Sequence, residues 1–320
     1  MKEISTKELK KLLENKEKFI LLDCRGIDYY LWEHLPTSLN IRWKYIQDQA
    51  PKLIPDKKTL IITYCDGFTC NASIRCYKNL VKLGYKNILE YSGGIADWKA
   101  YGYETVKDPK YIIAENVYRF PNQTYYGEEV NSYLIEEDDF ILLVDGPQQL
   151  TEEHEDFISY FDKPIKIFLS HGPTGGDVKE LQKKYKAKIY LHKKDATNEW
   201  LTVKPDLLFE NHFQFNNNLK VIHSPGHSPG HSPGSSVLYD AKNKILFTGD
   251  HIEGNEKGNI YDFFNHQDGT EGKVELRFKS AKKLMQYDFE KILPFHYKMI
   301  LKNAKNVLST FIKKYENLHH

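Results

Sequence analysis

The feature that most constrains the fold is a short apolar strand that ends at a cysteine and leads through a polar loop into a helix. Residues 59–64 read as the strand, the loop runs from Cys65 to Asn71, and residues 72–83 have helical periodicity. Such a unit is typical of a parallel sheet covered by helices. At this turn, unpaired backbone N–H groups and the helix dipole favour a thiolate. Cys65 is therefore a candidate nucleophile, and a small buried core residue is the alternative.

The chain divides into two parts that differ in the order of their predicted helices and strands. Over residues 1–106, helical segments alternate with short apolar strands, which predicts an α/β domain with a parallel sheet and flanking helices. A polar stretch at residues 103–110, which contains Pro109, marks the boundary. Residues 111–316 place their strands in two groups with helices beside both. This arrangement predicts a second domain in which two sheets lie between helix layers.

Composition argues against several classes of partner. The 320 residues carry 45 basic and 44 acidic side chains, so the net charge of the protein does not favour binding to nucleic acid or to a membrane surface. The sequence has no apolar run long enough to cross a bilayer, and its first ten residues lack the apolar stretch of a signal peptide. We therefore expect a cytoplasmic protein; composition gives no oligomeric state.

All four cysteines lie in the first domain: Cys24, Cys65, Cys70 and Cys76. They occupy the strands and a helix of an ordinary α/β unit, unlike the cysteines of a small secreted disulfide scaffold. The paired spacings of a structural zinc site are absent from the sequence. Redox or sulfur chemistry centred on one domain is the better interpretation, with Cys24 and Cys76 as core residues.

Four motifs in the right order resemble those of the rhodanese domain. They are Asp23-Cys24-Arg25, Glu33-His34-Leu35-Pro36, the loop headed by Cys65, and Gly93-Gly94-Ile95-Ala96-Asp97-Trp98. The resemblance implies a sulfurtransferase in which Cys65 accepts a sulfane sulfur, becomes a persulfide and passes the sulfur to an acceptor. It implies no cofactor for this domain, and small thiols or persulfides such as glutathione as substrates.

The loop after Cys65 is expected to bind the substrate through its backbone amides, which suit an anionic terminal sulfur. Its residues are Asp66, Gly67, Phe68, Thr69, Cys70 and Asn71. The rhodanese loop usually carries an arginine where this chain has Cys70. Loss of that cation favours a persulfide donor over the doubly charged thiosulfate. Cys70 either resolves the Cys65 persulfide, forms a reversible disulfide with Cys65, or only packs against the helix.

From residue 111 onward the chain resembles the metallo-β-lactamase superfamily, which implies an αββα sandwich with metal between the sheet edges. The motifs that carry the resemblance are at residues 143–146, 169–171, 224–230, 246–250 and 293–296. The family's His-x-His-x-Asp-His motif reads here His171-Gly172-Pro173-Thr174-Gly175-Gly176. Only its first histidine is present, so an ordinary two-metal hydrolase site is not expected. A zinc-dependent hydrolase of thioesters or lactones is correspondingly disfavoured.

Two histidines and one carboxylate remain, which is the ligand set of mononuclear non-haem iron sites. Resemblance to the persulfide dioxygenase branch of the superfamily implies one Fe(II) that oxidises low-molecular-weight persulfides. A tandem His-Ser-Pro-Gly repeat makes one ligand ambiguous, and its spacing to the following strand favours His231 over His227. The candidate residues are His171, His231, His227, Asp250 and His296. The alternative is a metal-free module that binds a thiol ligand or a partner protein.

Overall fold

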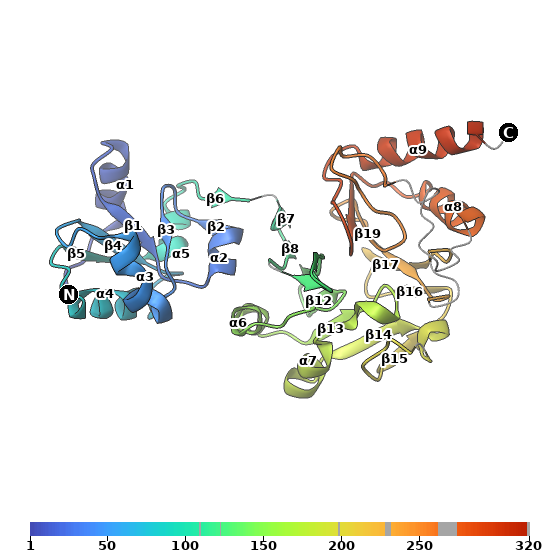
Figure 1. The fold of residues 1–320 in the computed structure, drawn as a ribbon, viewed down its shortest axis with the longest axis horizontal. Helices are drawn as coiled ribbons and strands as arrows, with labels where there is room; N and C mark the ends of the chain where they lie inside the picture. Colours follow the sequence, from blue (N-terminus) through green and yellow to red (C-terminus); the bar gives the residue numbers. More distant parts are fainter. Residues whose placement is uncertain (109, 122, 198, 228–231, 262–273, 319–320) are drawn as a thin grey trace. The chain divides into compact units, whose positions relative to one another are not determined.

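The computed structural model describes residues 1–108, 110–121, 123–197, 199–227, 232–261 and 274–318 (Figure 1). It separates into two compact units, Met1–Ile112 and Ile113–His320; the sequence predicts a boundary between 106 and 111. Both units combine helices with sheets, and the predicted α/β class is confirmed. In the described part of the chain, every helix is too short or too polar to span a lipid bilayer.

The first unit is built on a parallel sheet with the strand order β3-β1-β4-β5. Its register aligns Asp23 with Tyr64 and Tyr64 with Tyr91, so three strands end at the same level. Loops that follow these ends therefore gather at one edge of the sheet, where α/β proteins usually bind ligands. The strands are β1 (Ile20–Asp23), β3 (Leu39–Asn40), β4 (Ile61–Tyr64) and β5 (Ile88–Tyr91).

Helices cover both faces of this sheet because neighbouring strand residues point to opposite sides. Leu22 and Ile61 face a core with α3 (Ile46–Leu53) and α4 (Ala72–Lys82). Leu21 and Ile62 face the other core, with α1 (Thr6–Glu14) and α5 (Gly94–Ala100). The remaining elements of the unit are α2 (Ile27–Trp32), η1 (Trp43–Tyr45) and the antiparallel pair β2 (Glu33–His34) and β6 (Val106–Lys107).

The second unit contains a mixed seven-stranded sheet and a mixed five-stranded sheet. In the first, β8, β11 and β12 are successive antiparallel neighbours, as predicted, and β12 to β15 run parallel. Its order is β15 (Leu207–Phe209), β14 (Lys188–His192), β13 (Ile165–Phe168), β12 (Ile141–Val144), β11 (Tyr133–Glu136), β8 (Val117–Arg119) and β7 (Ile112–Ala114). The second sheet contains β16 (His212–Gln214), β17 (Leu219–His223), β18 (Ser236–Asp240), β19 (Ile245–Gly249) and β20 (Lys291–Pro294).

The two sheets face each other across one apolar core, which includes Val144 and Phe168 from the first sheet and Val221 and Phe247 from the second. The outer face of the five-stranded sheet packs on α8 (Val274–Leu284) and α9 (Ala304–Leu318). Figure 1 shows α6 (Glu152–Tyr160) and α7 (Val178–Tyr185) beside the seven-stranded sheet. The layers are therefore helix, sheet, sheet, helix. The short elements of the unit include β9 (Thr124–Tyr125), β10 (Glu128–Glu129), η2 (Gly172–Gly175) and η3 (Lys193–Asp195).

Candidate functional site

Cys65 follows β4 at the carboxyl edge of the parallel sheet, and its loop folds back on itself before α4 begins. The Cys70 N–H donates to the Gly67 carbonyl at 3.0 Å, which closes the turn. Phe68, Thr69 and Asn71 are exposed, whereas Asp66 is half-buried. The outer residues of the loop are therefore exposed, whereas the Cys65 sulfur beneath them is buried.

Helix α5 fixes the backbone of Cys65 from the other side. The Ile95 N–H donates to the Cys65 carbonyl at 3.1 Å, and the Ala96 N–H donates to the Asp66 carbonyl at 2.8 Å. Gly94 makes this approach possible, because it adopts a φ of +57° and a Cβ there would lie 2.3 Å from the Cys65 oxygen. The Gly93-Gly94 turn thus allows α5 to approach Cys65 and hold its backbone.

An ion-paired arginine ties the loop to β1. Arg25 Nη1 contacts Asp66 Oδ1 at 2.8 Å, and Arg25 Nη2 contacts Asp23 Oδ2 at 2.7 Å. The sequence allows either a structural pair between Asp23 and Arg25 or a role in shaping the loop. The structure shows both, because Arg25 pairs with Asp23 and also with Asp66 in the loop. Arg25 donates in addition to the Glu33 carbonyl at 2.6 Å.

The Cys65 thiol lies among acceptors and a hydroxyl, and the residue is only 1% exposed. Its Sγ is 3.2 Å from the Cys70 carbonyl and 3.4 Å from Ser73 Oγ. Ser73 in turn donates to Glu90 Oε1 at 2.8 Å, and both side chains are buried. Sequence reasoning missed Ser73 and Glu90; a charged residue within an apolar strand is the signal that could have found Glu90.

The two loop thiols share a hydrogen bond that sets which of them ionises first. The pKa of Cys65 is raised by its hydrogen bond to Cys70 and by burial. The pKa of Cys70 is lowered to about 6 by that same hydrogen bond and by the backbone N–H groups of Ala72 and Asp66. The expectation that the helix turn lowers the pKa of Cys65 is wrong. The backbone amides of the turn favour the Cys70 thiolate, and Cys70 is also the more accessible of the two residues.

All four cysteines are free thiols. Cys24 and Cys76 are fully buried, and the Cys76 thiol donates to the Ile41 carbonyl at 3.8 Å. The structure thus places them in the core, as predicted for these two residues.

A second cluster of titratable side chains forms in the second unit, where three imidazoles surround one carboxylate. Asp250 Oδ2 is 3.1 Å from His171 Nε2, 3.6 Å from His227 Nε2 and 4.0 Å from His296 Nε2. His171 follows β13, Asp250 follows β19 and His296 follows β20. The structure therefore gathers four of the predicted residues; His231 lies outside the described residues.

Buried polar groups hold this cluster in place. Ser170 Oγ is 3.0 Å from His171 Nδ1, and Arg277 donates to the backbone carbonyls of Asp250 and His251 at 2.7 and 2.8 Å. Asp195 accepts the backbone N–H groups of Gly172 and Gly234. Sequence reasoning missed these supporting residues, which carry no local motif.

The electrostatics of the cluster are those of an ion pair. Burial works against a charged His171, but the attraction and hydrogen bond of Asp250 raise the pKa of His171. Burial also works against an ionised Asp250, but His171, followed by His296 and His227, holds the pKa of that carboxyl well below its usual range. The imidazole and the carboxylate thus each favour the charged form of the other in a buried site.

The segment after His171 forms a short 3₁₀ turn, η2 (Gly172–Gly175), in place of further ligands. Asp177 is the N-cap residue of α7, the position that the sequence allows for it. Its side chain makes no capping hydrogen bond there; instead its Oδ2 accepts the Leu150 N–H at 2.8 Å.

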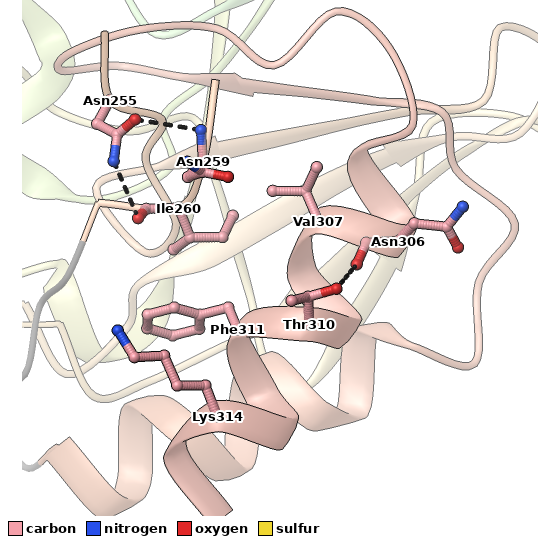
Figure 2. Close-up of a pocket in the computed structure, with 8 residues that line it drawn as sticks. All are labelled: Asn255, Asn259, Ile260, Asn306, Val307, Thr310, Phe311 and Lys314. Carbon is pink, nitrogen blue, oxygen red and sulfur yellow. Dashed lines mark hydrogen bonds between the residues drawn. The ribbon is translucent and has the colours of Figure 1, made fainter. Parts of the chain in front are cut away.

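A pocket of about 430 Å³ in the second unit is lined by residues of neither cluster (Figure 2). Figure 2 shows hydrogen bonds among its lining residues, as between Asn255 and Asn259 and between Thr310 and the Asn306 carbonyl. The lining residues include none of the predicted site residues: Asn255, Asn259, Ile260, Asn306, Val307, Thr310, Phe311 and Lys314.

Two protein families match this chain. The model of the rhodanese-like domain matches residues 5–101, and that of the metallo-beta-lactamase superfamily matches residues 163–296. The chain joins a rhodanese-like domain to a metallo-β-lactamase domain. Both predicted resemblances are confirmed.

The curated relatives match the rhodanese-like domain. The chain is 30% identical over 101 residues to the adenylyltransferase and sulfurtransferase UBA4 of Candida albicans, which covers 30% of this chain and 23% of that protein. It is 28% identical over 100 residues to the thiosulfate sulfurtransferase GlpE of Coxiella burnetii, which covers 31% of this chain and 89% of that protein. Together with the family match, these relatives support a sulfurtransferase.

Solved structures resemble each domain separately. The crystal structure of DIM-1 metallo-beta-lactamase covers 63% of this chain and 96% of its own, with a TM-score of 0.49 and 16% identity. The BH2092 protein of Bacillus halodurans covers 33% of this chain and 77% of its own, with a TM-score of 0.32 and 28% identity.

The metallo-β-lactamase fold implies metal at the Asp250 cluster. Ligand atoms that each lie about 2.1 Å from one cation are roughly 3 to 4 Å apart, and the distances from Asp250 to its three imidazoles fall in that range. Asp250 Oδ1 is buried without a hydrogen-bond partner among the described residues. Yet no group of three His, Cys, Asp or Glu side chains in that part of the chain is arranged to hold a metal ion. The side chains of His171, His227, His296 and Asp250 are of types that bind cations, and the distances from Asp250 to the imidazoles suit a shared cation. In the structure, however, His171 pairs directly with Asp250.

Proposed function

We propose that this protein carries sulfane sulfur as a persulfide on Cys65 and transfers it to small thiols. The observation that carries the proposal is the position of the Cys65 thiol. It lies at the carboxyl edge of the parallel sheet, inside a rhodanese-like domain, in a loop whose backbone is held by α5 and Arg25. A nucleophile held this rigidly has little freedom to lose when a donor binds.

Sulfur uptake is an exchange between the Cys65 thiol and the donor. Cys65 Sγ attacks the outer sulfur of a donor persulfide, the donor thiol leaves with the proton of Cys65, and a Cys65 persulfide remains. In the second half-reaction, an acceptor thiol attacks the terminal sulfur, takes it as a new persulfide, and returns its proton to Cys65.

The charges beside the loop favour a persulfide donor. Cys70 stands where a rhodanese usually carries arginine, and Arg25 is already paired with Asp23 and Asp66. Thiosulfate would bring two negative charges to a site that offers it no unpaired cation among these residues, whereas a persulfide brings at most one.

A transfer assay with Cys65→Ser tests this proposal. We expect wild-type protein to move labelled sulfur from glutathione persulfide to an acceptor thiol, and Cys65→Ser to lose that activity completely. Cys76→Ser is the matched control, because Cys76 is a buried thiol whose donated hydrogen bond serine can retain. Transfer that persists in Cys65→Ser would remove Cys65 as the carrier.

For the metallo-β-lactamase domain, we propose that His171, His227 and Asp250 hold one iron ion at which low-molecular-weight persulfides are oxidised. Two imidazoles and one carboxylate are the ligand set of mononuclear iron oxygenases, and the buried Asp250 Oδ1 has an unused lone pair. Ferrous iron would supply the chemistry that joins a persulfide to molecular oxygen. The Ser170 contact orients the His171 ring, and Arg277 holds the backbone of Asp250.

Metal analysis tests the iron proposal. Protein expressed with ample iron should contain about one iron per chain and consume oxygen with glutathione persulfide, and Asp250→Asn should lose both. The matched control is His212→Gln, which removes an exposed histidine. Iron-free wild-type protein that consumes no oxygen would instead support a metal-free module that binds thiols or a partner; bound zinc with thioesterase activity would support the hydrolase.

The same proposal places the enzyme in the cytoplasm. Cys65 and Cys70 must be free thiols when a sulfur donor binds, and a reducing compartment returns them to that state.

A further inference from the structure

We propose that Cys70 attacks the Cys65 persulfide, releases the carried sulfur as sulfide and leaves a Cys65–Cys70 disulfide. The inference rests on the proposed sulfur-carrying role of Cys65 and adds a second fate for the sulfur. Besides passing the terminal sulfur to an acceptor, the protein would act as a persulfide-cleaving dithiol.

The geometry of the loop carries this inference. Cys65 Sγ lies 3.2 Å from the Cys70 carbonyl oxygen, and the turn closed by the Cys70 N–H and the Gly67 carbonyl brings the two residues together. When Cys65 is loaded, its Sγ becomes the inner sulfur of the persulfide. Cys70 therefore lies beside the residue whose sulfur it must attack to form a disulfide.

The surroundings of Cys70 suit a nucleophile that must be regenerated. Cys70 lies just before α4, and the backbone N–H groups of Ala72 and Asp66 help to lower the pKa of its thiol. Cys70 is half-buried, whereas Cys65 is 1% exposed. An external thiol can thus approach the disulfide at Cys70 without opening the core.

The step balances without an external oxidant. After loading, the Cys70 proton moves to the terminal sulfur of the persulfide, and the Cys70 thiolate attacks Cys65 Sγ. The bond between the inner and terminal sulfurs breaks, hydrosulfide leaves, and a bond forms between the two cysteine sulfurs. The sulfane sulfur is reduced by two electrons and the two cysteines are oxidised by two. Two equivalents of a low-molecular-weight thiol, or one dithiol, then restore the reduced loop.

The other cysteine pair provides a matched control. Cys24 and Cys76 belong to the same core cluster, and both are fully buried. Cys76→Ser therefore removes a thiol from the same domain without touching the loop. It tests whether the number of thiols, and not the position of Cys70, controls the reaction.

A single-turnover experiment on the full-length reduced protein tests the inference. One equivalent of glutathione persulfide labelled with ³⁴S in its outer sulfur is added anaerobically without an acceptor. Labelled sulfide is measured with time, and peptide mass spectrometry locates persulfides and disulfides. We expect wild-type and Cys76→Ser protein to release most of the bound label and to form the Cys65–Cys70 disulfide. Cys70→Ser should retain the label on Cys65 and release sulfide only at the background rate of free glutathione.

The outcomes separate this inference from the proposed function. A wild-type Cys65 persulfide that persists as long as that of Cys70→Ser would overturn the inference and leave sulfur carriage intact. Label that moves to Cys70 without release of sulfide would also overturn it. Failure of Cys65 to take up any label, with or without Cys70, would overturn the proposed function itself.

Discussion

At the scale of single residues, the Cys65 sulfur is supported by a short chain of buried polar contacts. Ser73 on α4 lies 3.4 Å from Cys65 Sγ and donates to Glu90 on β5 at 2.8 Å. The Ser73 hydroxyl and N–H oppose the rise in the pKa of Cys65 that its Cys70 hydrogen bond and burial cause. Ser73 therefore positions the nucleophile and helps it to ionise.

Replacement of Ser73 should slow sulfur uptake. Ser73→Ala removes the hydroxyl that lies 3.4 Å from Cys65 Sγ, a contact worth about 1.4 kcal/mol, so we expect roughly tenfold slower loading of Cys65. The pKa of Cys65 should rise further, which moves the pH–rate profile for persulfide uptake to higher pH. Stopped-flow loading between pH 6 and 9 measures both effects. Glu90→Gln is the comparison variant, since it keeps an acceptor for Ser73; a Ser73→Ala profile that stays in place would assign Ser73 a purely structural role.

His192 should make the protein less stable in mild acid. The residue is 2% exposed, its Nε2 has no hydrogen-bond partner among the described residues, and its ring stacks on His223 at 4.2 Å. Burial and the neighbouring His223 lower the pKa of His192 to about 4. The folded state thus binds this proton less well than the unfolded chain, so stability falls as the pH drops from about 6.5 towards 4. Urea unfolding at pH 7.5 and pH 5 should show a smaller loss of stability for His192→Asn than for wild type; equal losses would contradict the assignment.

At the scale of elements, the sequence predicts the strands and helices that carry an apolar period or a family motif. The helical periodicity of residues 4–15 corresponds to α1; of the two N-caps that the sequence allows, Ser5 and Thr6, Ser5 is the cap and forms a full capping box with Glu8. Strand β15 carries no such signal, since Leu207 and Leu208 at its start are exposed. Short edge strands of this kind depend on tertiary pairing, which a local pattern does not record.

The candidate sites also contain residues that a local motif predicts and residues that only the tertiary structure reveals. Motif order identifies Cys65, His171 and Asp250, because each follows a strand of a recognisable unit. The partnership of Cys65 with Ser73 and Glu90 spans three elements and has no spacing rule. Ionisation is also a property of the assembled loop. The helix turn alone favours a Cys65 thiolate, whereas burial and the second thiol shift the charge to Cys70.

The turn that begins α5 should be essential for the Cys65 loop. Gly94→Ala forces a side chain into a φ of +57° and places its Cβ 2.3 Å from the Cys65 oxygen, so we expect loss of sulfur transfer and a lower unfolding temperature. Gly102→Ala is the matched control, because Gly102 has a φ of +75° with open space around it. It should cost only about 1 kcal/mol of stability and leave transfer unchanged. Equal effects of the two variants would show that strain alone, without the contact at Cys65, is responsible.

At the scale of the whole molecule, each compact unit has its own apolar cores. Leu22 lies in a fully buried cluster drawn only from the first unit, and Leu246 lies in one drawn only from the second. A core that is complete within its unit lets that unit fold cooperatively. Replacing a buried leucine with alanine leaves a cavity and lowers the free energy of unfolding by about 2 to 5 kcal/mol.

Hydrogen exchange should therefore locate each defect within one unit. In Leu22→Ala, we expect faster exchange in β1 and β4 peptides and unchanged exchange in β18 and β19 peptides; Leu246→Ala should give the reverse pattern. Mass spectrometry of the two variants at one pH measures both units in the same sample, so each variant serves as the control for the other. Loss of protection in both units from either substitution would mean that they unfold as one cooperative body. Separate responses would mean that the Cys65 loop can be destabilised, and sulfur transfer lost, while the Asp250 cluster keeps its arrangement.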